Sequence, residues 1–159
     1  MVDLFHNFST EIIFLHVLSA IIWVGGMIAI RFAVHYSMAK VEDPTIKLGR
    51  TLESLKRFFM MVVPSIFILL ITAIIMIIGL GFKGTELYSI VIIKEAIWVV
   101  MAVVFTVIYI KRNKAQKCFD NNDFAGAKNH LSPLAAWMIP LNTILGLVAL
   151  YFGITLRGL

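Results

Sequence analysis

Ionisable side chains interrupt the apolar runs of this sequence, and they are the residues best suited to do chemistry. His16 lies in the first run, one helical turn after Glu11, and the adjacent Lys94 and Glu95 lie in the third. An ionisable residue in an apolar helix is costly to bury, which makes it a candidate for a functional role. At one level of a bundle, an imidazole, an ammonium and a carboxylate would form a cluster that handles protons or binds a ligand.

The depth of these residues in their runs predicts that they lie close together. His16 lies a few residues inside the start of its run and Lys94 about six residues inside, so both are expected roughly 8–10 Å below one face of a bilayer. Lys94 and Glu95 are about 100° apart on a helix, so only one of them can point along the bundle axis. The helical stripes of His16 and Lys94 continue to Trp23 and Trp98. Alternatively, the ammonium of Lys94 reaches back to the membrane surface and Trp98 simply packs.

The elements that must position these residues are four apolar runs, each long enough to cross a hydrocarbon layer about 30 Å thick. Of the 159 residues, 60% are hydrophobic and 14% are charged, a composition that excludes both a soluble domain and a disordered chain. A single cysteine excludes a disulfide scaffold. We therefore expect an all-α fold, an integral membrane four-helix bundle that forms one domain over residues 1–159. The expected helices cover about 12–34, 58–82, 88–110 and 133–156.

The basic residues predict how the bundle is oriented. Most lysines and arginines lie between the first and second runs or between the third and fourth, whereas the other end has only Lys83 and Arg157. By the positive-inside rule, the two basic loops face the cytoplasm and both termini face the periplasm. This distribution explains the net charge of +5 without a nucleic-acid partner. We expect a multi-pass protein of the bacterial inner membrane, with an amphipathic extension of the second helix over residues 48–57.

Other residues offer weaker candidates for ligand binding. His35 ends the first run and His130 precedes the fourth. Two imidazoles at one membrane level could ligate an ion or a haem iron, although histidines at helix ends are more often interfacial groups. The adjacent Gly25 and Gly26 would let a flat ligand lie against the backbone. Eight methionines could suggest copper(I), but they are scattered along the sequence, so core packing explains them better.

A set of short motifs resembles two related groups of membrane proteins. The motifs are Leu15 to Gly26 with His16 and Trp23, Lys56-Arg57-Phe58, Gly79, Tyr88 six residues before Lys94, and Lys111-Arg112. In order and spacing they resemble the copper-resistance protein D (CopD) domain and the HemJ-type protoporphyrinogen oxidase. The resemblance covers about residues 12 to 112 well and the fourth helix loosely. Trp23-Val24-Gly25-Gly26 is closer to the CopD version.

The HemJ resemblance implies a b-type haem and dependence on a histidine in the first helix and a lysine in the third, which match His16 and Lys94. We therefore expect an oxidoreductase that oxidises a tetrapyrrole or exchanges electrons with quinone. His16 would be an axial ligand of the haem iron, and Lys94 and Glu95 would be catalytic. Ligation by two histidines would need His35 with His130, or His16 from two subunits of a homo-oligomer. The residues expected to hold the cofactor are His16, Trp23, Trp98, Arg57, His35 and His130.

The CopD resemblance implies copper transport or copper homeostasis as the alternative. His16 would then bind copper, with methionines as further ligands. A protonated Lys94 at the level of His16 would repel the cation unless Glu95 or Glu11 neutralised it. A third alternative is a small scaffold subunit of a larger membrane complex, with no chemistry of its own.

Overall fold

The computed structural model describes residues 2–156, and these form an all-helical bundle without a strand. Arg157, one of the two basic residues predicted at the less basic end, lies outside the described residues. The chain begins with the short α1 (Val2–Asn7) and continues as four long helices joined by short loops. The first long helix (Ser9–Ala39) consists of α2 (Ser9–Ala20), η1 (Ile21–Gly25), α3 (Gly26–Ala29), η2 (Ile30–Val34) and α4 (His35–Ala39). The second and third are α5 (Pro44–Leu80) and α6 (Tyr88–Asp120), and the fourth (Phe124–Thr155) consists of α7 (Phe124–Pro133), η3 (Leu134–Met138) and α8 (Ile139–Thr155).

All four long helices are long and apolar enough to span a membrane, which confirms the expected membrane architecture and indicates a multi-pass membrane protein. They are longer than the apolar runs, with 31, 37, 33 and 32 residues. At about 1.5 Å per residue they measure about 46–56 Å, more than the roughly 30 Å of a hydrocarbon core. The expected extension over residues 48–57 forms part of α5. Asp43 caps this helix, since its carboxylate accepts hydrogen bonds from the backbone N–H groups of Thr45 and Ile46.

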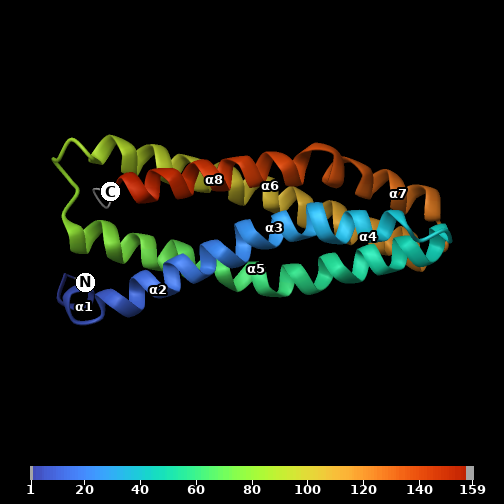
Figure 1. Ribbon diagram of the computed structural model, residues 1–159, viewed down its shortest axis with the longest axis horizontal. Helices are drawn as coiled ribbons and strands as arrows, with labels where there is room; N and C mark the ends of the chain where they lie inside the picture. Colours follow the sequence, from blue (N-terminus) through green and yellow to red (C-terminus); the bar gives the residue numbers. More distant parts are fainter. Residues whose placement is uncertain (1, 157–159) are drawn as a thin grey trace.

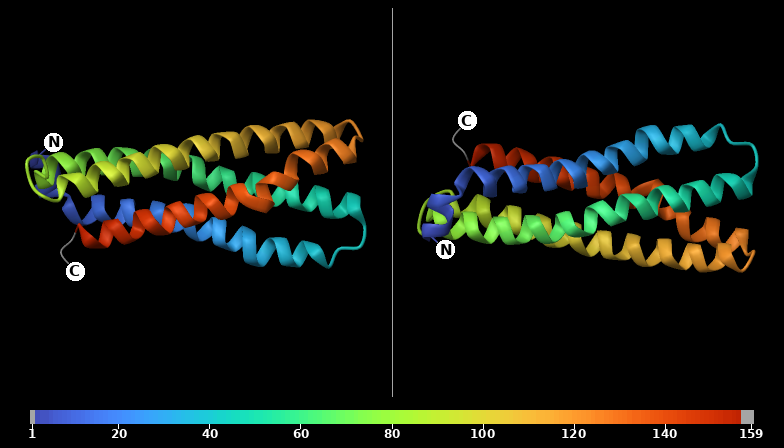
Figure 2. Two further views of the ribbon diagram at one scale, coloured as in Figure 1. Left: turned by 90° about the horizontal axis from the view of Figure 1, so that it is seen from above. Right: turned by 90° about the horizontal axis from the view of Figure 1, so that it is seen from below.

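The long helices run alternately up and down, so the loops gather at two ends (Figure 1). One end carries both termini and the loop 81–87; we call it the terminal end. The other, which we call the basic end, carries the loops 40–43 and 121–123, which lie within the two basic segments (Figures 1 and 2). Both basic segments therefore lie at one end, as the positive-inside rule requires of a chain with this charge pattern.

The buried core fills the middle of the bundle and the half toward the basic end. Its aromatic centre is Phe105 of α6, whose ring lies 6.0 Å from that of Trp23 and 5.2 Å from that of Phe59 between centroids, both edge to face. In the first and third long helices, the buried members of this core begin only at Trp23 and Met101. His16 and Lys94 thus lie in the terminal half, outside this central cluster, where the buried apolar side chains of these two helices are Ile12 and Val91.

A glycine sets the register at which the first and third long helices meet α8. A Cβ atom on Gly146 would lie 2.6 Å from Cγ2 of Val24, closer than real Cβ contacts allow, and 3.2 Å from Cε of Met101, which is a tight contact. Glycine is therefore needed for the close approach of these three helices. The contact aligns Val24, Met101 and Gly146 at one level of the bundle.

Candidate functional site

The imidazole of His16 is anchored to the neighbouring helix. Its Nδ1 lies 2.8 Å from Oγ1 of Thr72, which is 56 residues later on α5. Thr72 is buried and His16 is half-buried, so this bond lies on the inner side of the α2–α5 pair. Alignment of α2 along α5 positions both residues, since the two helices pack against each other over their length in the terminal half (Figure 1).

The hydrogen bonds of Thr72 assign the proton on His16. The Thr72 hydroxyl donates to the backbone oxygen of Ile68 at 2.6 Å, which uses its one proton. Its oxygen can then only accept from His16, so the network assigns the hydrogen of a neutral imidazole to Nδ1. Nε2 is left with a free lone pair. This is the arrangement of a histidine ligand whose second nitrogen is held by a hydrogen bond, and equally that of a base ready to take a proton.

Lys94 approaches the same level from α6, and its ammonium lies against the backbone of α8. Its Nζ is 3.2 Å from the position that a Cβ on Gly153 would take. The side chain is half-buried, and among residues 2–156 its ammonium has no hydrogen bond or ion pair. The adjacent Glu95 is exposed and Glu11 is exposed as well, so neither is enclosed with the ammonium.

The register at Gly146 explains why these residues share a level. His16 precedes Val24 by eight residues, and Lys94 precedes Met101 by seven, so they lie about 12 and 10 Å from the Gly146 contact along parallel helices. Gly153 follows Gly146 by seven residues on the antiparallel α8, again about 10 Å in the same direction. Together with Thr72, these positions give one residue from each of the four long helices. We call His16, Thr72, Lys94 and Gly153 the terminal-half site.

Two tryptophans lie on the side of this site that faces the core: Trp23 belongs to the core, and Trp98 packs against it. Trp23 in the π-helical turn η1 is almost fully buried, and Trp98 on α6 is half-buried, one turn from Lys94. The indole N–H of each is buried, and within the described part of the chain neither has an acceptor. Buried donors of this kind normally have a partner, so water or a ligand is expected to satisfy them. π-Helical turns occur often at functional sites.

The remaining predicted cofactor residues lie at the opposite end of the bundle. Arg57 precedes Thr72 by fifteen residues and His35 follows His16 by nineteen, so they lie about 22 and 28 Å away along their helices. Arg57 is exposed and its Nε donates to Glu53 at 2.8 Å. His35 is exposed on α4, and His130 is half-buried on α7 at the same end. One cofactor therefore cannot contact both His16 and these three residues.

No group of three or more His, Cys, Asp or Glu side chains that could hold a metal ion occurs in the portion of the chain that the structure describes. In the terminal-half site, His16 is the one residue with a free imidazole nitrogen. Of the eight methionines, Met27, Met101 and Met138 are buried in the hydrophobic core, as the packing interpretation expects, whereas Met60 and Met61 are exposed.

Two residues of the terminal-half site did not emerge from sequence reasoning as site residues. Thr72 carries a hydroxyl group in the middle of an apolar run. Such a group needs a hydrogen-bond partner in lipid, so the sequence could have indicated that Thr72 faces another helix. Gly153 was one of several small residues, and no sequence feature distinguishes it from the others. Comparisons with models of protein families, with curated proteins and with solved structures gave no match.

Proposed function

We propose that this protein is a redox protein of the bacterial inner membrane that holds a b-type haem through His16, similar to the HemJ-type protoporphyrinogen oxidases. The observation that carries the proposal is the hydrogen bond from His16 Nδ1 to Thr72, which leaves Nε2 free for a metal. A histidine ligand almost always donates its other N–H in this way, which fixes the tautomer and the ring orientation. Bound haem would supply one-electron redox chemistry.

The ammonium of Lys94 supports a ligand that carries carboxylates. An ammonium inside an apolar bundle needs a counter-ion or a strong acceptor, and none is present among residues 2–156. A tetrapyrrole brings propionate groups, so Lys94 would bind a propionate of the haem or of a tetrapyrrole substrate. A bare copper ion fits less well, because a protonated Lys94 at the level of His16 would repel it, and no group of three or more His, Cys, Asp or Glu side chains occurs among the described residues to hold it.

The surroundings of the site are also suited to a large, flat ligand. The central core cluster reaches only to Trp23 and Met101 on the first and third long helices, and beyond these residues the buried apolar side chains of the two helices are Ile12 and Val91. The unpartnered indole N–H groups of Trp23 and Trp98 provide two further donors at its inner boundary. The chain thus contributes a ligand atom, a cation and two donors. In this proposal the terminal end faces the periplasm.

An absorption spectrum of the protein purified in mild detergent tests this function. We expect a Soret band and, after reduction, an α-band of the b type. His16→Ala should abolish both bands, whereas His6→Ala and His35→Ala, in which exposed histidines are removed, should leave them unchanged. A spectrum that His16→Ala does not alter would move the ligand elsewhere. A colourless protein that retains copper would replace the haem proposal with copper transport.

A further inference from the structure

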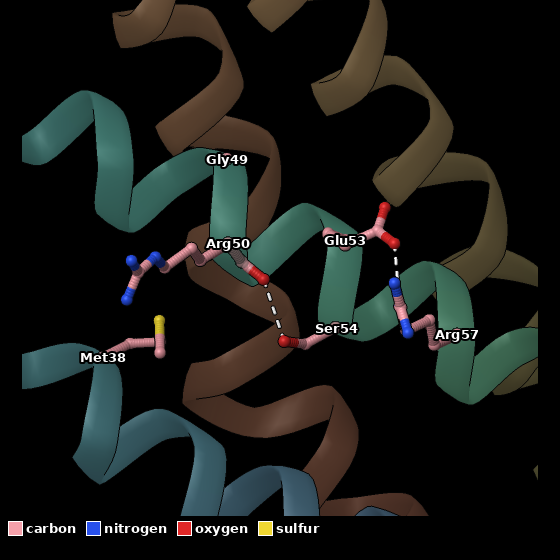
Figure 3. Close-up of a pocket in the computed structure, with 6 residues that line it drawn as sticks. All are labelled: Met38, Gly49, Arg50, Glu53, Ser54 and Arg57. Atoms are coloured by element: carbon pink, nitrogen blue, oxygen red, sulfur yellow. Dashed lines mark hydrogen bonds and ion pairs between the residues drawn. The ribbon is translucent and has the colours of Figure 1, made fainter.

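A pocket lies far from the terminal-half site, between α4 and α5 at the basic end. It has a volume of about 440 Å³ and is lined by Met38, Gly49, Arg50, Glu53, Ser54 and Arg57. Figure 3 shows the side chain of Arg50 extending toward Met38, with Ser54 between Arg50 and the Glu53–Arg57 pair. We call this the basic-end pocket.

The charges in the basic-end pocket favour an anion. Arg57 and Glu53 form an exposed ion pair through one nitrogen of the guanidinium, which leaves the other two nitrogens of Arg57 free. Arg50 has no ion pair or side-chain hydrogen bond to any residue in the described range. Two arginines and one carboxylate give the pocket a net charge of +1. Guanidinium groups bind phosphate oxygens through paired N–H donors, so phosphate is the anion that they suit best.

The position of the pocket along α5 matches the headgroup layer of a bilayer. Arg57 directly precedes the apolar run that begins at Phe58, and Ser54 and Arg50 lie about 4 and 10 Å further out along the helix. The polar layer on each side of the hydrocarbon core is about 5–8 Å thick. Arg57 and Ser54 therefore lie at the depth of the lipid phosphates, and Arg50 lies at the outer edge of this layer.

The same face of α5 continues into an apolar surface. Arg50, Ser54, Arg57 and Met61 follow one another at steps of four, three and four residues, so they form one stripe of the helix. Met61 lies one turn inside Arg57, and 57% of its surface is exposed. A phosphate bound between the arginines would thus have an apolar surface directly beneath it, where acyl chains can pack. A free anion would make no use of this surface.

We propose that the basic-end pocket binds the phosphate headgroup of an anionic phospholipid, with Arg50 and Arg57 on the phosphate and Met61 against an acyl chain. Glu53 lowers the affinity, because its carboxylate repels the headgroup. Basic pockets between helices at this level are a recurrent form of lipid recognition. The proposal is independent of the haem, since the pocket is more than 20 Å from Thr72 along α5 by the spacing of about 1.5 Å per residue.

Native mass spectrometry of the whole chain in detergent, titrated with dioleoylphosphatidylglycerol or dioleoylphosphatidylcholine, tests the proposal. We expect preferential retention of phosphatidylglycerol. Replacement of both arginines (R50Q with R57Q) should weaken this retention about thirtyfold, at about 1 kcal/mol per basic group. The matched control, K114Q with K128Q, removes two exposed charges of the same end outside the pocket and should change retention less than twofold.

A second variant, E53Q, distinguishes a direct effect on lipid binding from damage to the fold. E53Q should strengthen phosphatidylglycerol retention about threefold, because it removes the exposed carboxylate that repels the headgroup. A damaged fold would not increase affinity. Equal retention of both lipids, equal loss in the control, or unchanged retention in E53Q would each overturn the proposal. Full displacement of the lipid by millimolar inorganic phosphate would overturn the lipid as the occupant and assign a free anion instead.

Discussion

Nδ1 of His16 and Oγ1 of Thr72 lie 2.8 Å apart and join the first and second long helices inside the terminal half of the bundle. Since the Thr72 hydroxyl already donates to Ile68, the bond fixes both the tautomer and the direction of the imidazole. A single threonine thus determines which nitrogen of His16 is free to bind a metal or a proton.

Thr72→Val tests this role, because valine keeps the shape of threonine and removes the acceptor. We expect haem affinity to fall on the order of tenfold, the usual effect of losing the partner of a histidine ligand. Titration of the purified protein with haem, followed by the Soret band, measures this. Thr106→Val is the control, since Thr106 is exposed and bonds only to its own helix. Equal affinity in the wild type and Thr72→Val would show that the bond does not orient a ligand.

Substitutions of Lys94 and Glu95 should differ in their effect on the reaction rate, although the two residues are sequence neighbours. Lys94→Ala removes the half-buried ammonium that we propose as the partner of a carboxylate, so porphyrinogen oxidation should fall at least about tenfold while haem content changes little. Glu95→Gln alters an exposed side chain and should leave the rate within about twofold. The fluorescence of the porphyrin product follows the reaction. Full activity of Lys94→Ala would mean that the ammonium only reaches toward the membrane surface.

Gly153→Ala should disturb Lys94 without disturbing the fold. The added methyl group would lie 3.2 Å from Nζ, so the flexible end of Lys94 must move by a few tenths of an ångström. We expect slower oxidation with an unchanged thermal unfolding curve. Gly25→Ala is the matched control, because its Cβ meets nothing closer than Cγ2 of Ile21 at 4.0 Å. If both variants react at the wild-type rate, the contact between Lys94 and α8 has no role in the reaction.

Gly146→Ala should lower the free energy of unfolding by about 1–3 kcal/mol, the usual cost of overpacking a core. The reason is the approach of Val24 to 2.6 Å from the added Cβ. In a double-mutant cycle, Val24→Ala should recover part of this loss, because it removes the clashing methyl group. Denaturant titration in detergent gives the four stabilities. Strict additivity would show that Gly146 and Val24 do not determine the helix register.

Several features of this protein follow from the sequence alone. The lengths of the apolar runs determine four helices that can cross a membrane, and the structure confirms them. The sequence concentrates lysine and arginine in the segments after the first and third runs. Four alternating helices bring these two basic segments to the same end of the bundle (Figure 1). The depth of His16 and Lys94 in their runs predicts that they lie at a common level. Each of these features can be predicted from a single segment, because hydropathy and helical rise do not depend on the neighbouring helices.

The tertiary structure decided which side chains meet. Lys94 and Glu95 are about 100° apart, and only the rotation of α6 in the bundle turns the first inward and leaves the second exposed. The partnership of His16 with Thr72, and of Lys94 with Gly153, depends on the register between helices. The register comes from close contacts such as that of Val24 with Gly146. Such contacts join residues more than a hundred positions apart, so no local pattern in the sequence specifies them.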